Sequence, residues 1–271
     1  MNDDKPTNAV SRHLDNLGRN TVRGIEEVGN GGVMMFESLY WLIFGPKQGQ
    51  PVRLNAVVEQ MMGIGITAIP IIAMLAGAIS VTLAIQSIFI LRIFGAESYV
   101  TAGLALGVVR EFAPLITGIL VAGRSGSALA ARIGTMKINQ EIDALKVMGI
   151  NPVRYLVAPP LIAMLIMVPC LTIMAAAVGL FLAGLYINID LGVSLTAYWD
   201  QIINYMEMEH ISQGLIKSAL YSIEIAIIGV VNGAGVQGGA EGVGRATTRS
   251  VVQAISAIIV TAMVVVIIST V

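Results

Sequence analysis

Long apolar runs separated by short polar segments dominate the chain after residue 60. A helix rises about 1.5 Å per residue and the hydrocarbon core of a bilayer is about 30 Å thick, so about 20 apolar residues can cross it. Five runs reach that length: 61–91, 100–121, 156–187, 211–236 and 251–271. The pattern therefore predicts an all-α integral membrane protein with five transmembrane helices, and Pro70 predicts a kink in the first of them.

The first 60 residues follow a different pattern. Residues 1–13 are polar and are expected to form a disordered tail, and residues 14–60 alternate irregularly between apolar and charged positions. We interpret 14–60 as elbow helices lying at the membrane interface, broken at 29–32, and 61–271 as a five-span domain. A cytosolic helix that binds a partner is the alternative for the N-terminal segment.

Composition supports a membrane protein and excludes a soluble domain. Hydrophobic residues make up 56% of the chain and charged residues 12%, and the mean hydropathy is +0.81. The single cysteine, Cys170, has no partner for an intramolecular disulfide and lies inside an apolar run. We expect it to pack against neighbouring helices.

One polar segment, 123–152, interrupts the apolar runs and carries its own period. Its apolar residues recur at helical spacing: Ile138, Ile142, Leu145 and Met148. Charged residues fill the opposite face, and Gly149 followed by Pro152 supplies a stop signal. The segment predicts a short amphipathic helix over 138–149 at the membrane surface; a solvated connecting loop is the alternative.

The distribution of lysine and arginine predicts the orientation. Six lie before the first run, five between the second and third, and two between the fourth and fifth, whereas the opposite loops hold Arg92 alone. By the positive-inside rule the N-terminus and 123–152 are cytoplasmic and the C-terminus is outside. The acidic outer loop contains apolar residues that suggest a short amphipathic helix: Leu195, Tyr198, Trp199, Ile202 and Tyr205.

Arg110 and Glu111 lie in the middle of the second apolar run, where each costs about 2.5–3.5 kcal/mol at the bilayer centre on insertion scales. Adjacent helical residues point about 100° apart, so these two do not pair well with each other. Lys217 and Glu224 in the fourth run are the candidate partners. The two charges are expected either to lock helices together or to line a substrate cavity.

Motifs for catalysis are missing from the sequence. It contains no G-x-x-x-x-G-K-[ST] motif, so the chain is not expected to hydrolyse ATP itself, and no local motif suggests a nucleophilic triad. His210 with Glu207 and Glu209 comes nearest to a metal site, and no metal site is expected. The glycine pairs Gly103/Gly107 and Gly229/Gly233 predict close helix packing.

Two long blocks carry a family resemblance: GLALGVVREFAPLITGILVAGRSGSALAARIGTMKINQEIDALKVMGINPVRYLVAPP and GVGRATTRSVVQA. They resemble the MlaE (YrbE) family of permeases, which serve MCE-protein lipid transporters, and the resemblance extends from about Gly24 onward. It implies a homodimer in the bacterial inner membrane that binds two cytoplasmic P-loop ATPases carrying ATP and Mg. It also implies a periplasmic MCE hexamer, often a STAS-domain subunit, and phospholipid or another lipid as cargo, with no cofactor on this chain and no nucleic acid.

The resemblance also implies roles for individual residues. Lipid-cavity positions are matched by Leu83, Gln86, Ile90, Leu91, Phe94, Arg110 and Glu111. Phe94 stands where some relatives have tyrosine. A coupling helix that docks on the ATPase is matched by Ile138, Glu141, Ile142, Asp143, Leu145, Met148 and Gly149. Residues 124–136 would act as a stiff lever between that helix and the second span.

Two other functions remain open from the residues alone. One is an ion-coupled or proton-coupled secondary transporter with Arg110, Glu111 and Glu224 as its relay. The other is a passive membrane anchor for an MCE complex. The amphipathic segment 138–149 and the lack of an internal repeat argue against the secondary transporter.

Overall fold

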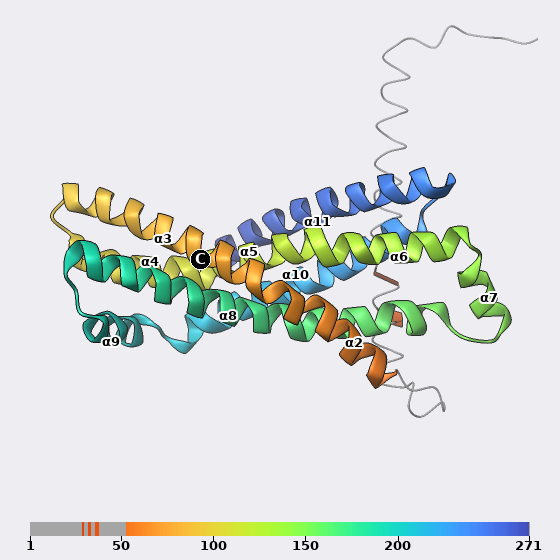
Figure 1. Cartoon of the computed structure of the whole chain (residues 1–271), viewed down its shortest axis with the longest axis horizontal. Coiled ribbons are helices and arrows are strands. Elements are labelled where there is room, and N and C mark those ends of the chain that lie inside the picture. The colour runs from red at the N-terminus through yellow and green to blue at the C-terminus, as the bar shows by residue number, and fades with distance from the viewer. Residues whose placement is uncertain (1–28, 30–31, 34–35, 38–52, 271) are drawn as a thin grey trace, which may run out of the picture.

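The computed structural model describes residues 53–270, together with 29, 32, 33, 36 and 37. The predicted tail 1–13 lies outside the described residues, as does most of the predicted interfacial segment 14–60. Long helices run side by side along the length of the molecule, with α7 near one end and α9 near the other (Figure 1). These two ends are called the α7 end and the α9 end below.

Residues 53–270 contain ten α-helices and five short 3₁₀ or π segments. The α-helices are α2 Leu54–Ile64, α3 Ile69–Ile93, α4 Val100–Gly107, α5 Ala113–Val121, α6 Ser127–Ile138, α7 Glu141–Val147, α8 Ala158–Leu191, α9 Leu195–Tyr205, α10 Met208–Ala234 and α11 Gly239–Thr270. The 3₁₀ segments are η2 Ile66–Ala68 and η3 Glu97–Tyr99, and the π segments are η4 Val108–Phe112, η5 Ala122–Gly126 and η6 Val153–Val157.

The predicted five-span architecture is confirmed. The spans long and apolar enough to cross a membrane are Leu54–Ile93, Glu97–Ile138, Val153–Leu191, Met208–Ala234 and Gly239–Ser269. Each begins or ends several residues outside the apolar run that predicted it, because polar residues at helix ends continue the backbone hydrogen-bond pattern beyond the hydrocarbon core. The second span continues to Ile138, so the helical lever predicted over 124–136 is confirmed as a structural element.

The first span is irregular just before Pro70. The 3₁₀ segment η2 separates α2 from α3, and Pro70 is the second residue of α3, where its missing N–H has no partner to lose. The hydroxyl of Thr67 donates to the carbonyl of Gly63, 2.6 Å away, and so satisfies a backbone group beside this segment. The helix is therefore irregular about one turn before Pro70, and the kink itself stays a prediction.

Small residues bring α10 close to α6. A Cβ on Gly229 would lie 3.1 Å from the carbonyl oxygen of Gly126, and one on Gly233 would lie 2.8 Å from that of Ala130. The predicted packing role of this glycine pair is confirmed. The other pair behaves differently, because nothing lies within 4 Å of a Cβ built on Gly103. The expectation for Gly103 was wrong, since spacing alone does not show which face of a uniformly apolar helix meets a neighbour.

The short amphipathic helix predicted in the acidic loop is α9, which lies at one end of the bundle. Ser194 caps it by accepting a hydrogen bond from the N–H of Ala197. Tyr198 is buried, its hydroxyl donates to the carbonyl of Leu180 at 2.9 Å, and its ring fills the space beside Gly184. Burial raises the pKa of the Tyr198 hydroxyl above its usual value, so it remains a hydrogen-bond donor.

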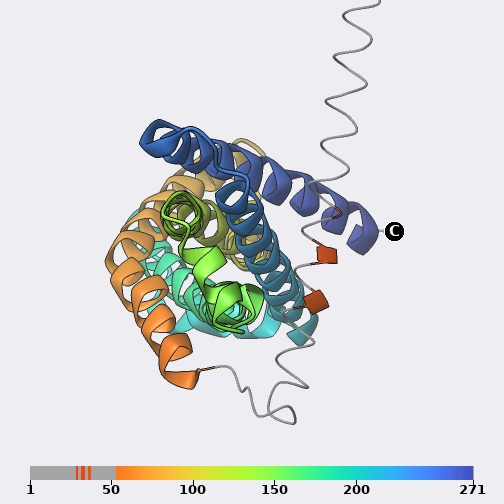
Figure 2. The same ribbon diagram turned by 90° about the vertical axis from the view of Figure 1, so that its right-hand side faces the viewer.

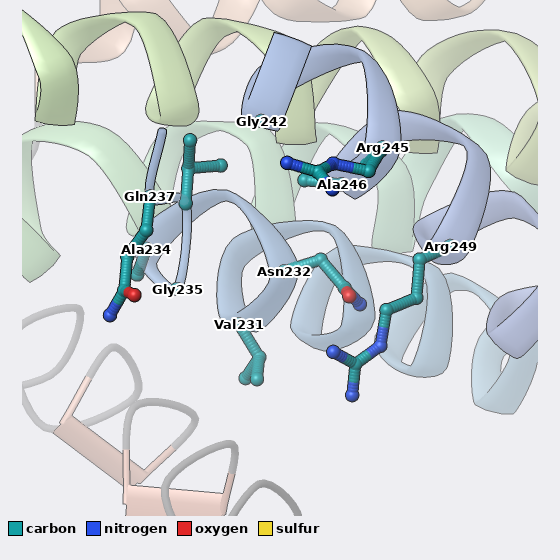
Figure 3. A pocket seen from close by; sticks show the side chains of 10 residues that line it. Val231, Asn232, Ala234, Gly235, Gln237, Gly242, Arg245, Ala246 and Arg249 are labelled. Atoms are coloured by element: carbon teal, nitrogen blue, oxygen red, sulfur yellow. The ribbon is translucent and has the colours of Figure 1, made fainter. Parts of the chain in front are cut away.

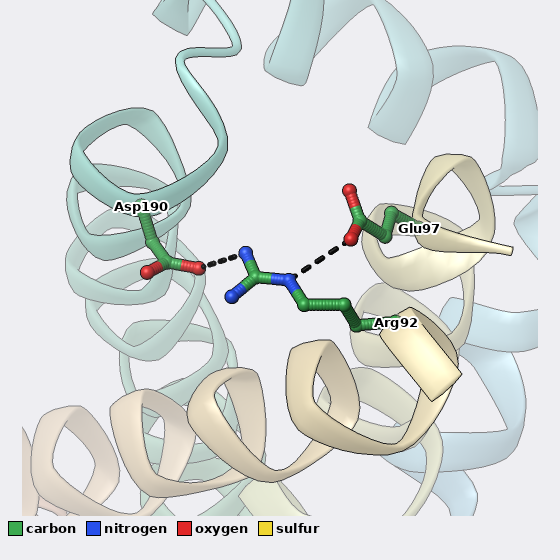
Figure 4. Close-up of polar contacts among 3 residues, drawn as sticks. All are labelled: Arg92, Glu97 and Asp190. Carbon is green, nitrogen blue, oxygen red and sulfur yellow. Dashed lines mark hydrogen bonds and ion pairs between the residues drawn. The ribbon is translucent and has the colours of Figure 1, made fainter. Parts of the chain in front are cut away.

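An ionic cluster ties three helix ends together near α9 (Figure 4). The Arg92 guanidinium at the end of α3 contacts Glu97 through Nε and Asp190 of α8 through Nη2, each at 2.9 Å. The side chains are partly exposed, so each pair is worth little by itself. Their shared arginine fixes the relative positions of α3, η3 and α8.

Two features complete the arrangement. Viewed from the α7 end, α11 lies across one side of the bundle and α2 runs along another (Figure 2). Cys170 lies on α8 with its side chain exposed, so the packing role expected for it was wrong. α8 is apolar around its whole circumference, and such a helix gives no sequence signal for which face is buried.

Candidate functional site

The backbone is irregular where Arg110 and Glu111 lie. Both belong to the π segment η4, in which the N–H of Ala113 bonds to the carbonyl of Val108, five residues earlier. Pro114 follows, and because proline has no N–H it cannot donate to the carbonyl of Arg110. The Arg110 carbonyl is thereby left available to a side chain, and π segments of this kind occur frequently at functional sites.

Lys217 of α10 fills that position. Its Nζ donates to the Arg110 carbonyl at 3.1 Å and to Glu111 Oε1 at 2.5 Å. The Lys217 side chain is only 1% exposed, whereas that of Glu111 is 30% exposed. Gly214 permits this approach, since a Cβ there would lie 2.5 Å from the carbonyl oxygen of Val109. The sequence-based suggestion of Lys217 as a partner for this pair is confirmed.

Glu224, the other suggested partner, lies elsewhere. Its Oε1 accepts a hydrogen bond from the hydroxyl of Thr261 on α11. No ion pair between described residues includes Glu224. The relay of Arg110, Glu111 and Glu224 that a secondary transporter would need is therefore not assembled by direct contacts in the described structure.

The Arg110 guanidinium has no ion pair or hydrogen bond with any side chain among the residues that the structure describes. Its side chain is half-buried within the second span. Glu111 is already neutralised by Lys217, so the group of three carries one excess positive charge. A guanidinium in this position is suited to a phosphate or carboxylate, which it binds through paired N–H donors.

The lipid-cavity positions expected along the first span fall into two groups. Gln86, Ile90 and Phe94 are exposed, with Phe94 at 76%, while Leu83 and Leu91 pack against the core cluster near α9. α3 contacts α4 and α5, the helices on either side of η4. No hydrogen bond or ion pair between described residues connects these positions to Arg110 or Glu111.

Further exposed apolar side chains on α3 were not predicted as site residues: Ile85, Phe89 and Ile93. No local pattern distinguished them, because almost every position of α3 is apolar. Only packing shows that α3 buries its other face, including Ala84 and Ile88, against α8.

The amphipathic segment predicted over 138–149 contains helix α7, Glu141–Val147. Ile138 is the last residue of α6, and Gln140 forms the turn in a left-handed conformation with φ 59°. Gly149 ends α7 with φ 73°, and the N–H of Ile150 bonds to the carbonyl of Leu145 at 2.9 Å. This is the Schellman arrangement, so the stop signal at Gly149 is confirmed.

The structure divides the expected coupling residues between two faces of α7. Leu145 is buried and Ile142 packs against the main core, so these two hold α7 on the bundle. Glu141, Asp143 and Met148 point outward and are exposed. Val147, which the apolar period excluded, is 89% exposed and is an additional candidate for contact with a partner.

The exposed charges of α7 are organised locally. Lys146 Nζ contacts Asp143 Oδ1 at 3.0 Å, and this hydrogen bond and the lysine charge lower the pKa of Asp143 below its usual value. Asn139 Nδ2 donates to Glu141 Oε1 at 3.0 Å. The outward face therefore carries ordered acidic groups beside an exposed valine and methionine.

A cavity of about 350 Å³ separates α7 from the start of the third span. Asn151 lies in its wall, where its side-chain oxygen accepts from the N–H groups of Val153 and Arg154 and so caps the following helix. Its amide donates to Glu37 Oε1 at 2.7 Å. The link connects the α7 end to the N-terminal segment.

A larger cavity of about 520 Å³ lies at the turn between α10 and α11 (Figure 3). Arg245 and Arg249 from α11 line it together with Gln237 and Asn232. Guanidinium groups are suited to an anionic group, although Arg245 also contacts Glu241 at 3.8 Å and the Asn232 amide donates to Ile228 and Gln253. The sequence signal for this site was the pair of arginines four residues apart at the start of the fifth span, which place both side chains on one face of α11.

Comparisons with known proteins agree with this architecture. A probable ABC transporter permease protein of Rickettsia typhi is 33% identical over 239 residues, which cover 87% of this chain and 89% of that protein. The intermembrane phospholipid transport system permease protein MlaE of Haemophilus influenzae is 31% identical over 247 residues, covering 90% and 92%. The chloroplastic protein TRIGALACTOSYLDIACYLGLYCEROL 1 of Arabidopsis thaliana is 38% identical over 157 residues, covering 58% and 45%. The family model described as Permease MlaE matches residues 57–268, and the chain therefore belongs to the MlaE permease family.

Proposed function

We propose that this protein is the membrane-spanning subunit of an ATP-driven transporter that moves phospholipid between two membranes. Membership of the MlaE permease family supports the transporter class, and the name of the Haemophilus influenzae relative supports phospholipid as cargo. ATP and Mg would bind to a separate P-loop ATPase. This chain would contribute the lipid path and the surface through which the ATPase acts.

The observation that carries the proposal is the Arg110 guanidinium without a side-chain partner inside a membrane span. A charge at this depth is costly unless something compensates it. Within the described residues Lys217 compensates Glu111, and nothing compensates Arg110. A phospholipid phosphate supplies the missing negative charge, and exposed apolar residues of α3 such as Ile90 and Phe94 supply a surface for its acyl chains.

The proposed assembly is a homodimer in the bacterial inner membrane. The fifth span supports a second copy, because it buries the smallest share of its apolar length within the chain. Two ATPases, an MCE hexamer on the periplasmic side and a STAS-domain subunit would complete it, as the family resemblance implies. The lysine and arginine distribution supports a cytoplasmic N-terminus and α7 end, with the C-terminus in the periplasm.

The proposed mechanism couples the two ends of the second span. Closure of the ATPases would move α7, which Leu145 and Ile142 fix to the bundle. The turn at Gln140 joins α7 to α6, and because η4, α5, η5 and α6 form one continuous helical span, this movement would reach Arg110. The cavity between the two subunits, lined by spans one, two and five, would narrow and displace the lipid.

Measurement of retained phospholipid tests the proposed role of Arg110 in binding lipid. The complex with Arg110→Ala, purified in detergent, should retain several-fold less phospholipid by mass spectrometry than the unmodified complex. Arg132→Ala is the matched control, since Arg132 is exposed on α6. Equal phospholipid retention by the Arg110 variant and the control would refute the role of Arg110.

Co-purification separates the three function classes. A P-loop ATPase and phospholipid purified together with this chain support the proposed transporter. Purification of the chain with neither an ATPase nor phospholipid would favour the secondary transporter. Co-purification of an MCE protein without an ATPase would favour the passive anchor.

Charge reversal tests the coupling surface. Glu141→Lys with Asp143→Lys should abolish co-purification of the ATPase while the dimer persists, because these carboxylates point outward from α7. Asp200→Lys with Glu207→Lys is the control, since both residues are exposed near the α9 end. Unchanged co-purification in the α7 variant would contradict the coupling role.

A further inference from the structure

The outer part of the fifth span has little packing within its own chain. α11 contacts α10, α6, η5 and α5, and Ala254, Ile258 and Ala262 are its buried apolar residues. Beyond Ala262 Val265 and Val266 are half-buried, and the other large side chains are exposed: Met263, Val264, Ile267 and Ile268. The direction of this outer part is therefore set by the last contacts that precede it.

Two polar contacts connect α11 to α10. Asn232 Nδ2 donates to Gln253 Oε1 at 2.6 Å, and the hydroxyl of Thr261 donates to Glu224 Oε1. Asn232 follows Glu224 by eight residues, and Thr261 follows Gln253 by eight residues. The two contacts thus lie about 12 Å apart along both antiparallel helices and define one register between them.

The contact of Glu224 with Thr261 is the outer one, and it lies where hydrocarbon offers no alternative partner. The second oxygen of Glu224, Oε2, is buried without a hydrogen-bond partner among the described residues. Lys217 is committed to Glu111 and to the Arg110 carbonyl. If Thr261 moved away from Glu224, a second polar atom of the carboxyl group would lose its partner, so the contact resists separation of the two helices.

We propose that Glu224 is a positioning residue for the fifth span. Through Thr261 it holds α11 against α10, so that the outer part of α11 keeps a fixed direction as a wall of the lipid path. This rests on the proposed function of lipid transport. It assigns to Glu224 a role separate from the group of Arg110, Glu111 and Lys217.

The same contact extends the mechanical connection from α7. α10 approaches α6 closely at Gly229 and Gly233, where side chains would collide with the backbone of the second span. With α11 tied to α10 at two points, α6, α10 and α11 move as one body. Movement of α7 then reaches the cavity wall formed by the fifth span as well as the second span.

The test compares phospholipid movement with ATP hydrolysis in vesicles that contain the complete complex and a fluorescent phospholipid. Thr261→Val and Glu224→Leu should lower phospholipid moved per ATP hydrolysed by about threefold or more, in line with the strength of hydrogen bonds between transmembrane helices. Thr261→Ser and Glu224→Gln keep the donor or acceptor and should restore the ratio. Ser256→Ala is the matched control, because that hydroxyl bonds only to Val252 of its own helix.

Two results would overturn the proposal: a Thr261→Val ratio equal to that of the Ser256→Ala control, or a Glu224→Gln ratio as low as that of Glu224→Leu. An unmodified complex that moves no phospholipid would instead contradict the proposed function. The two failures are therefore distinguishable in one experiment.

Covalent linkage supplies an independent measurement. In a Cys170→Ala background, E224C and T261C would be joined by a short bis-methanethiosulfonate reagent. The unlinked double-cysteine variant lacks the contact and should show the lowered ratio, and linkage should restore the phospholipid moved per ATP hydrolysed, with each single cysteine variant treated with the reagent as a control. Loss of transport on linkage alone would show that α10 and α11 must move apart, which would overturn the proposal.

Discussion

Removal of the Lys217 ammonium is the most informative perturbation of the proposed site. In Lys217→Met the side chain keeps nearly the same length and loses its charge. Glu111 then loses its only ion-pair partner among the described residues, and the Arg110 carbonyl loses its side-chain donor. Both groups remain inside a membrane span, where water cannot easily replace the ammonium.

The expected cost follows from burial. Breaking a buried ion pair by removing one partner destabilises a protein by about 3–5 kcal/mol. Lys217 is fully buried, but the Glu111 side chain is 30% exposed and keeps part of its solvation after the change. We therefore expect a loss near the lower end of that range, about 3 kcal/mol.

A double-mutant cycle measures this energy. Unfolding in mixed dodecylmaltoside and SDS micelles would be followed by tryptophan fluorescence, with Trp199 beside the buried Tyr198 as a reporter. Lys217→Met, Glu111→Leu and the combined variant would be compared with the unmodified protein. Because the combined variant leaves no unpaired charge at this contact, it should be more stable than Lys217→Met, with a coupling energy of about 2 kcal/mol.

Additive effects of the two substitutions would refute the reasoning, since independent residues show no coupling energy. A Lys217→Met protein as stable as the unmodified one would refute it as well, because it would mean that Glu111 needs no partner. In either case the inference that Arg110 carries an excess positive charge would no longer be supported, because it depends on the pairing of Glu111 with Lys217.

Two further predictions concern packing and pH. Gly214→Ala should cost about 1–3 kcal/mol, because its Cβ would lie 2.5 Å from the Val109 carbonyl oxygen, whereas Gly103→Ala has open space and should be neutral or stabilising in the same unfolding assay. The pKa of Asp143 is lowered in the folded protein, so its contact with Lys146 contributes to stability above the ordinary value of 3.8 and that contribution is lost as the pH falls below it. A carbon-13 NMR titration should place the Asp143 midpoint below 3.8, and Lys146→Ala should return it toward 3.8; a midpoint unaffected by Lys146→Ala would contradict this cause.

The sequence by itself determined that the chain lies in a membrane, how many spans it has, and that α7 and α9 exist. Hydrocarbon cannot satisfy backbone hydrogen bonds, so an apolar run of sufficient length has few alternatives to a spanning helix. Short amphipathic segments such as 138–149 were also predictable, because their polar and apolar faces differ. Glycine signalled a helix end correctly at Gly149, where the backbone conformation favours it.

Only the tertiary structure decided which face of each span is buried and which charges meet. Spans such as α3 and α8 are apolar on all sides, so their periodicity did not show that Phe89 is exposed or that Cys170 faces outward. That Lys217 rather than Glu224 contacts the segment with Arg110 and Glu111 depends on Gly214, which sets how closely α10 approaches η4. Contacts between helices distant in the sequence depend on their register, and no local pattern encodes that register.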